Sequence, residues 1–340
     1  MSKRCVIGVD LGGTNVRAAA VYEDGTWAGE RIEQSSRGRE GYVATLESVG
    51  QAVLEAARKA AAKPEAVGVA IPGTVNDATG IVHWSPNLGY EENGVFRYWL
   101  DIPFRETLSR WVDLPIVMAN DANAATLGEY MYGSGKGYAK CLVMFTLGTG
   151  IGNGVILSPD AVHGKAKGPL MLLGGNKGGA EMGHSIILNG GLDCSAGNYG
   201  SIEAYCQRDA IVQRAIYKLI RGQDSLLNAM VGGDYSKLTP KVLSQAADEG
   251  DVLAQEVWEE VGMLLGVGVG NAINIFAPDV VAIGGQISKA GEHLFKAVRR
   301  SARDTAIPGL FRDARILQAE QIEDAGLLGG AALAFQSLSD

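Results

Sequence analysis

The chain of 340 residues is long enough for two ordinary domains, and its net charge of −8 argues against nucleic-acid binding, which needs clustered Lys and Arg. Its four cysteines are scattered without a C-x-x-C pair, which favours a reducing, cytoplasmic compartment over a disulfide framework. The sequence contains neither a run of 18 apolar residues nor a signal-peptide pattern, so no contact with a membrane is predicted.

Residues 5–22 are predicted to form a strand, a glycine turn and a second strand. Asp10 lies near the end of the first apolar run, where a carboxylate can hold Mg²⁺ through water. The turn itself consists of Gly12, Gly13, Thr14 and Asn15. Its backbone N–H groups could hold a phosphate oxygen, because glycine permits close backbone approach. An ordinary Gly-Gly hairpin is the competing interpretation.

A helix is predicted over residues 42–62 from the 3.6-residue spacing of its apolar positions. Residues 115–130 then combine an apolar strand with a helix, and Asn120 and Asp121 stand at the junction. Asp121 has two interpretations. It could cap a helix that begins at Ala122, or it could act as a general base beside a substrate-binding Asn120.

Residues 141–157 repeat the arrangement of residues 5–22, with a strand, a turn rich in Gly and Thr, and a return strand. The turn contains Gly148, Thr149, Gly150 and Gly152. A G-x-G-x-G string alone is a weak signal, but two such turns, each after a strand, suggest two lobes that each offer a hairpin to one nucleotide.

The segment 178–205 adds further polar residues at turns and helix starts. Glu181 and His184 lie three residues apart, and a glycine-punctuated loop that contains Cys194 leads to Glu203. Together with Asn120 and Asp121, these side chains form a set of donors and acceptors that suits the vicinal hydroxyls of a sugar.

Toward the C-terminus, helices are predicted over 239–250 and 251–278, the first from Thr239 to Gly250 and the second ended by Pro278. A buried strand follows over 280–288, and its Gly284 and Gly285 could form a third glycine turn, against an adenosine.

Strands that alternate with helices predict an α/β fold. The expected domains are a small N-terminal α/β lobe of residues 1–119 and a large α/β lobe of residues 120–323. The C-terminal helix, residues 324–340, is expected to pack back on the small lobe.

These motifs together resemble the ROK sugar kinases of the actin-like, hexokinase-type ATPase superfamily. "GVDLGGTNVRAAAV" and "GTGIGNGVI" are similar to that family's two phosphate loops, "ANDANAAT" to its Asn-Asp pair, "GGAEMGH" to its E-x-G-H motif and "VVAIGG" to its adenosine segment. "GVAIPGTVNDATGIV" with "SPNL" looks like its sugar-domain segment. The resemblance covers most of the chain and implies two actin-like (ribonuclease H-like) lobes around a central cleft.

The resemblance implies roles position by position. Asp121 would be the general base, and Asp10 would position Mg²⁺ through water. The sugar would be bound by Asn120, Asp121, Glu181, His184, Glu203, Gly73 and Asn87. ATP would be bound by Asp10, Gly12, Gly13, Thr14, Asn15, Gly148, Thr149, Gly150, Gly284 and Gly285.

One departure from the family lies in the loop before Glu203. The family pattern C-x-C-G-x-x-G-C-x-E makes a structural zinc site with His184, but its three cysteine positions read Cys194, Ala196 and Ser201 here. Since zinc prefers four N or S ligands in a closed site, no structural zinc is expected. His184 must then take its orientation from another hydrogen-bond partner. A second departure is the longer stretch 158–179, whose role as lid, interface or specificity loop stays open.

The resemblance implies an ATP-dependent hexose kinase, with glucose as the leading substrate, that works as a dimer or tetramer. Mannose, N-acetylmannosamine, fructose or allose are alternative substrates, and polyphosphate is an alternative donor. A sugar-responsive repressor is a competing class, but only four residues precede the first strand, too few for a helix-turn-helix domain. A non-catalytic sugar-binding protein is a further alternative, which the presence of Asp121 and both glycine turns disfavours.

Overall fold

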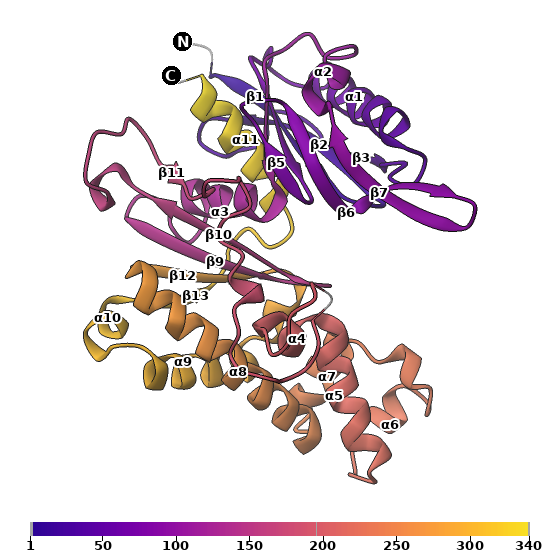
Figure 1. Cartoon of the computed structure of the whole chain (residues 1–340), viewed down its shortest axis with the longest axis vertical. Coiled ribbons are helices and arrows are strands. Elements are labelled where there is room, and N and C mark those ends of the chain that lie inside the picture. The colour runs from indigo at the N-terminus through magenta and orange to yellow at the C-terminus, as the bar shows by residue number, and fades with distance from the viewer. Residues whose placement is uncertain (1–2, 195, 339–340) are drawn as a thin grey trace. The chain divides into compact units, whose positions relative to one another are not determined.

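The structure is a computed structural model that describes residues 3–194 and 196–338 (Figure 1). Its strands form two five-stranded sheets and one three-stranded sheet, and helices accompany both larger sheets, so the predicted α/β class is confirmed. None of the described helices is both long enough and apolar enough to cross a membrane.

The first large sheet has the strand order β3-β2-β1-β4-β8. Its strands are β1 (Cys5–Leu11), β2 (Asn15–Tyr22), β3 (Ile32–Ser35), β4 (Val67–Ile71) and β8 (Ile116–Asn120). β1 pairs antiparallel with β2 and parallel with β4, which in turn pairs parallel with β8. Strands buried on both faces, such as all-buried β4, explain the continuous apolar runs in the sequence.

Helices cover this sheet. α1 (Tyr42–Arg58) packs on β1, β2 and β3, whereas α11 (Ala325–Ser337, yellow in Figure 1) lies against β1, β4 and α3 (Asp121–Tyr132). The C-terminal helix thus lies against strands from the N-terminal part of the chain. Glycines make this packing close, because a side chain at Gly8 or Gly68 would overlap the backbone of α11.

The second large sheet has the order β11-β10-β9-β12-β13, which repeats the topology of the first. Its strands are β9 (Cys141–Leu147), β10 (Ile151–Leu157), β11 (Leu170–Met171), β12 (Val280–Gly284) and β13 (Arg315–Gln318). β9 and β12 are parallel, as β1 and β4 are. The internal repeat predicted from the two glycine turns is thus a repeat of sheet topology.

The remaining helices are α2 (Phe104–Leu108), α4 (Ile202–Cys206), α5 (Arg208–Ile220), α6 (Leu227–Met230), α7 (Pro240–Asp248), α8 (Val252–Phe276), α9 (Glu292–Thr305) and α10 (Pro308–Asp313). Of these, α7 and α8 lie close to the ranges predicted from the sequence, 239–250 and 251–278. Thr239 caps α7 by accepting from the N–H of Val242, as its sequence position predicts. Short 3₁₀ turns lie at Pro159–Ala161, Met182–His184, Tyr235–Lys237 and Gln286–Ala290.

The third sheet, β5-β6-β7, extends from the first unit as a long hairpin. It consists of β5 (Thr74–Asn76), β6 (Ile81–Glu92) and β7 (Val95–Ile102). One face carries the exposed rings of Trp84 and Tyr98, whose centroids lie 6.4 Å apart.

The chain packs into two compact units. One comprises Met1–Ala139, Gly154–Ala180 and Glu323–Asp340, and the other Lys140–Asn153 and Glu181–Ile322. This division differs from the expected boundary between residues 119 and 120, because α3 packs on α11 and therefore belongs with the N-terminal unit. The stretch 158–179 also belongs to that unit, where the side chain of Gln336 donates to the carbonyl of Pro169 at 2.9 Å.

Candidate active site

The first glycine turn joins β1 to β2, as the sequence predicts. The Gly12 N–H closes it by donating to the carbonyl of Asn15 at 2.9 Å. Gly13 packs on Asn87 so closely that a methyl group would lie 2.8 Å from the Asn87 carbonyl oxygen. The structure therefore places Asn87, expected to contact sugar, beside the turn expected to hold phosphate. The Asn15 amide donates to Glu33 at 2.8 Å, away from the turn's backbone N–H groups.

Asp10 lies beside this turn and is held by Arg17, its partner across the β1–β2 ladder. Arg17 Nη2 donates to Asp10 Oδ2 at 2.5 Å, and Nη1 donates to the carbonyl of Glu323 at 2.8 Å. Burial opposes the charge of Arg17, but Asp10 and two further carboxylates outweigh it and raise its pKa. Any cation bound to Asp10 would therefore share the carboxylate with a permanent positive charge.

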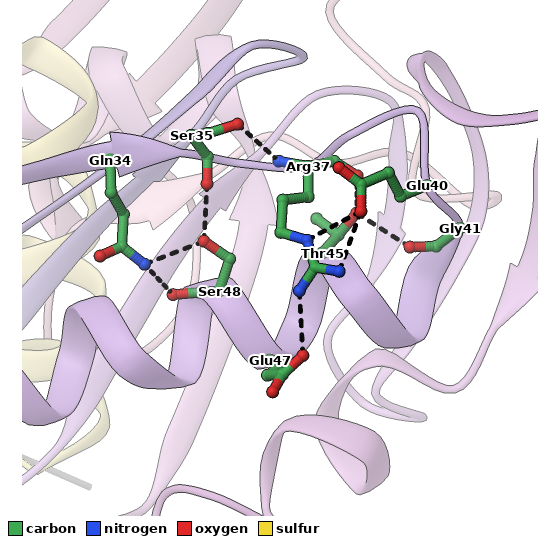
Figure 2. Close-up of polar contacts among 8 residues, drawn as sticks. All are labelled: Gln34, Ser35, Arg37, Glu40, Gly41, Thr45, Glu47 and Ser48. Atoms are coloured by element: carbon green, nitrogen blue, oxygen red, sulfur yellow. Dashed lines mark hydrogen bonds and ion pairs between the residues drawn. The ribbon is translucent and has the colours of Figure 1, made fainter.

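The loop between β3 and α1 supports the first turn from outside. The Ser36 N–H donates to the carbonyl of Thr14 at 2.8 Å, and Gly38 lies against the carbonyl of Gly13 with no room for a side chain. Figure 2 shows the polar residues that tie this loop to α1: Gln34, Ser35, Arg37, Glu40, Gly41, Thr45, Glu47 and Ser48. Ser48 Oγ donates to the carbonyl of Ser35 at 2.6 Å, for example. The turn thus has a rigid support.

Asn120 and Asp121 stand at the start of α3. Asn120 Oδ1 accepts from the N–H groups of Ala122 at 3.0 Å and Asn123 at 3.1 Å, so Asn120 is the N-cap. The interpretation of Asp121 as the cap is therefore wrong. Asp121 is the first helical residue, where the positive end of the helix dipole favours an ionised carboxylate, and its Oδ1 accepts from the Ala122 N–H at 2.8 Å.

Gly73 lies next to Asn120 in the structure. The Asn120 Nδ2 donates to the Gly73 carbonyl at 3.0 Å. Gly73 has a φ of 111°, and a side chain there would overlap the carbonyl of Trp84. The first unit thus gathers Gly73, Asn120 and Asp121 at the carboxyl end of β8, where open α/β sheets commonly bind ligands.

The second glycine turn joins β9 to β10. The Gly148 N–H donates to the carbonyl of Gly150, and the Gly148 carbonyl accepts from the N–H of Arg208 at the start of α5, both at 2.9 Å. Gly285 has a φ of 78° and lies against the Leu147 carbonyl, so a side chain there would overlap it. The structure therefore brings the Gly284–Gly285 turn to the end of β9, next to the second glycine turn.

Glu203 links this turn to the residues expected to bind sugar. Its Oε2 accepts from the N–H of Ile151 at 2.7 Å, and its Oε1 accepts from Cys194 Sγ at 3.5 Å. Cys194 Sγ lies 3.6 Å from His184 Nδ1, so the partner that the sequence required for His184 is Cys194. His184 Nδ1 also lies 4.0 Å from Glu203 Oε1. Glu203 and Cys194 are buried, whereas the His184 ring is partly exposed.

Glu181 begins the 3₁₀ turn that carries His184. Its carbonyl accepts from the His184 N–H at 3.2 Å, and its side chain reaches solvent. Desolvation by the surrounding protein nevertheless raises the pKa of Glu181; His184 opposes this shift and the negative Glu203 adds to it. A carboxylate that lies near a second carboxylate and reaches solvent is suited to accept hydrogen bonds from the hydroxyls of a ligand.

The sequence matches the ROK family over residues 6–337. The chain belongs to this family. It is 34% identical to a glucokinase of Thermotoga maritima over 98% of both chains. It also aligns, with a TM-score of 0.79 and 30% identity, to a ROK family glucokinase of Streptomyces griseus solved with glucose and AMPPNP, and this match covers 98% of the chain and 99% of that glucokinase.

The fold is therefore that of the ROK sugar kinases and the actin-like ATPases. The family also contains regulators. The Escherichia coli DNA-binding transcriptional repressor Mlc is 28% identical over 78% of this chain but only 59% of the repressor. ROK membership alone consequently leaves the choice between catalysis and regulation to the site residues.

The residues of this ROK chain do not fit the family's structural zinc site. Ala196 has no ligand atom, and the Ser201 hydroxyl caps α4 by accepting from the Ala204 N–H at 3.3 Å. His184, Cys194 and Glu203 place ligand atoms within 4.8 Å of one another, and theirs is the one such group of three or more among residues 3–194 and 196–338. Three ligands, one of them a carboxylate held by Ile151, do not make a closed zinc site.

Two residues of the site escaped sequence reasoning. The Asp10–Arg17 pair follows from the hairpin register, since a turn that pairs Leu11 with Val16 must also pair Asp10 with Arg17. Thr146 occupies the position in β9 that Asp10 occupies in β1, and its buried hydroxyl has no hydrogen-bond partner among the described residues. Aligning the two turns in the sequence would have found it.

Proposed function

We propose that this ROK protein is an ATP-dependent glucokinase that transfers the γ-phosphate of ATP to glucose and forms glucose 6-phosphate. The observation that carries the proposal is the start of α3. Asn120 caps the helix there, and Asp121 follows it at the first helical position. A residue there is suited to act as the general base. The relatives that are glucokinases support glucose as the sugar.

The proposed chemistry needs positioning and one proton acceptor. Asp121 takes the proton of the attacking sugar hydroxyl. Asn120, Glu181, His184, Glu203, Gly73 and Asn87 bind or border the sugar. Glu203 and Glu181 accept hydrogen bonds from hydroxyls, and the burial of Glu203 strengthens its bonds because water competes less.

The two glycine turns are proposed to hold ATP, the first with Gly12, Gly13, Thr14 and Asn15 and the second with Gly148, Thr149 and Gly150. Gly284 and Gly285 border the adenosine. Asp10 would hold Mg²⁺, which supplies neutralisation of phosphate charge when bound. The AMPPNP in the S. griseus glucokinase supports ATP as the donor. Arg17 keeps the Asp10 carboxylate fixed beside the turn.

We also infer that the protein is a cytoplasmic homo-oligomer, a dimer or tetramer. Its net charge of −8 supports the further inference that it does not bind nucleic acid. We place α3 in the N-terminal unit, so the unit boundary no longer lies at residue 120 as expected from the sequence.

An ADP-release assay over a panel of sugars tests the proposal. The panel contains glucose, mannose, N-acetylmannosamine, fructose and allose, with ATP or polyphosphate as the donor. The proposal expects the highest kcat/KM with glucose and ATP, because a site that hydrogen-bonds each hydroxyl discriminates strongly against a misplaced one. A better substrate within the panel would replace glucose. Absence of turnover with every sugar would overturn the kinase assignment in favour of a sugar-binding regulator.

A further inference from the structure

We infer that Cys194 is a positioning residue. Its thiol holds His184 and Glu203 together by hydrogen bonds, without a metal. It also keeps the ring proton of His184 on Nδ1. The inference rests on the proposed function for its consequence in catalysis, but its structural part concerns only the hydrogen bonds of this loop.

The loop holds Cys194 by backbone bonds alone. The Cys194 N–H donates to the carbonyl of Asn198 at 2.8 Å, and the Gly197 N–H donates back to the carbonyl of Cys194 at 2.9 Å. The Asn198 side chain donates to the carbonyl of His184 at 3.1 Å. The thiol is therefore presented to His184 and Glu203 by hydrogen bonds within the loop.

The thiol lies between the two groups. It is 2% exposed, 3.6 Å from His184 Nδ1 and 3.5 Å from Glu203 Oε1. Both distances are within the range of hydrogen bonds that involve sulfur, whereas the direct separation of 4.0 Å between Nδ1 and Oε1 is too long for one. Cys194 is consequently the hydrogen-bonding bridge between two side chains that are too far apart to hydrogen-bond directly.

The proton positions follow from what each atom can do. A carboxylate only accepts, so the thiol S–H donates to Glu203 Oε1, and a bond to a charged acceptor is the stronger choice. The sulfur then has only lone pairs to offer His184, so Nδ1 must carry the ring proton. In the neutral form of the ring Nε2 is then unprotonated, so it accepts a hydrogen bond from a ligand hydroxyl and does not donate one.

The consequence reaches the second glycine turn. The other carboxylate oxygen of Glu203 accepts from the Ile151 N–H at 2.7 Å, directly after that turn. A chain of hydrogen bonds thus runs from the Ile151 N–H through Glu203 and Cys194 to His184. Loss of the thiol is expected to release His184, while Glu203 keeps its bond to Ile151.

Four variants test the inference. Cys194→Ala removes the bridge, Cys194→Ser keeps a donor and an acceptor, and Cys206→Ala is the matched control. Cys206 is also fully buried, on α4, but its thiol faces the carbonyl of Val261. His184→Gln identifies the His184 signals among those of the four histidines in ¹⁵N-labelled protein.

The first measurement is the ¹⁵N–¹H spectrum of the histidine rings together with the zinc content of the purified protein. We expect His184 to show a protonated Nδ1 and an unprotonated Nε2 in the wild type, in Cys194→Ser and in Cys206→Ala. Cys194→Ala is expected to lose this pattern, and zinc is expected below one tenth of an equivalent. A protonated Nε2 in the wild type, an unchanged pattern in Cys194→Ala, or one equivalent of zinc would each overturn the inference.

The second measurement is the steady-state kinetics with glucose and ATP. We expect Cys194→Ala to raise the KM for glucose about tenfold, the effect of losing one hydrogen bond, with kcat and the KM for ATP within about twofold of the wild type. Cys194→Ser should recover most of the loss, and Cys206→Ala should show none. If the wild type phosphorylates no sugar, the proposed function fails, whereas the spectra and the zinc content still decide the inference. If Cys194→Ala does not fold, the wild-type spectrum and Cys194→Ser decide it.

Discussion

The two glycine turns of this ROK protein have the same sheet topology but recruit their carboxylates differently. The first turn has Asp10 on its own strand, paired with Arg17 across the hairpin. The second turn has Thr146 at the corresponding position and is held by Glu203, which comes from the distant helix α4. Repetition of a fold therefore fixes where the turns lie, whereas individual side chains decide what each turn does.

The proposed proton acceptor, Asp121, lies outside both glycine turns. Replacing Asp121 should have the largest effect on activity. Asp121→Asn is expected to lower kcat by about 10²–10⁴-fold with little change in either KM, because general-base catalysis typically contributes that factor. Steady-state ADP release measures it. Asp113→Asn, an exposed position in the same unit, is the control. A kcat for Asp121→Asn within threefold of the wild type would rule out Asp121 as the base.

Asp10→Asn removes the carboxylate beside the first turn and should have the next largest effect on activity. We expect kcat to fall about 10–100-fold and the Mg²⁺ concentration for half-maximal rate to rise, because Asp10 is proposed to hold the ion. The matched change in the second turn, Thr146→Val, should leave the Mg²⁺ requirement unchanged. Equal shifts in both variants would contradict the assignment of the metal to the first turn.

A pair of glycine variants separates structural from ligand-binding roles in the two turns. A methyl group at Gly13 would lie 2.8 Å from the Asn87 carbonyl oxygen, whereas one at Gly148 meets no atom closer than 3.9 Å. Gly13→Ala should therefore lower the free energy of unfolding by about 1–3 kcal/mol. Gly148→Ala should leave stability unchanged and raise the KM for ATP about tenfold, since its methyl group enters space proposed for phosphate. Thermal melts and kinetics of both variants check this contrast.

Glu181→Gln should have the smallest effect on activity and should raise the stability slightly. The folded-state pKa of Glu181 is raised above its ordinary value of 4.5, so ionising this carboxyl costs stability as the pH rises through that window. Glutamine removes the cost. The variant should melt at the same temperature as the wild type at pH 4 and slightly higher at pH 7, with a glucose KM raised a few-fold. A lower melting temperature at pH 7 alone would show that the ionised Glu181 stabilises the fold.

Much of the fold could be predicted from the sequence because local patterns specify it. The hairpins that turn at Gly12–Thr14 and at Gly148–Gly150, the cap at Thr239 and the helix after Asp324 all depend on short-range spacing or capping chemistry. The division into units could not be predicted, because it depends on the packing of α3 against α11, residues that lie far apart in the chain.

For the candidate site, residue types could be predicted but their partners could not. The sequence placed Asn120 and Asp121 at a helix start without showing that Asn120 takes the cap. It required a partner for His184 without showing that Cys194 supplies it. Both outcomes depend on which side chains come within hydrogen-bond distance in the folded protein, and the spacing of residues in the sequence does not determine that.

The most direct test of the central claim is to follow the γ-phosphate itself. Wild-type protein is incubated with γ-labelled ATP, Mg²⁺ and glucose, and the products are separated and identified. The account predicts that the label appears in glucose 6-phosphate in a one-to-one ratio with ADP, and that ADP formation stops when glucose is omitted. Label that stays in ATP or is released as inorganic phosphate, with glucose and Mg²⁺ present, would contradict it.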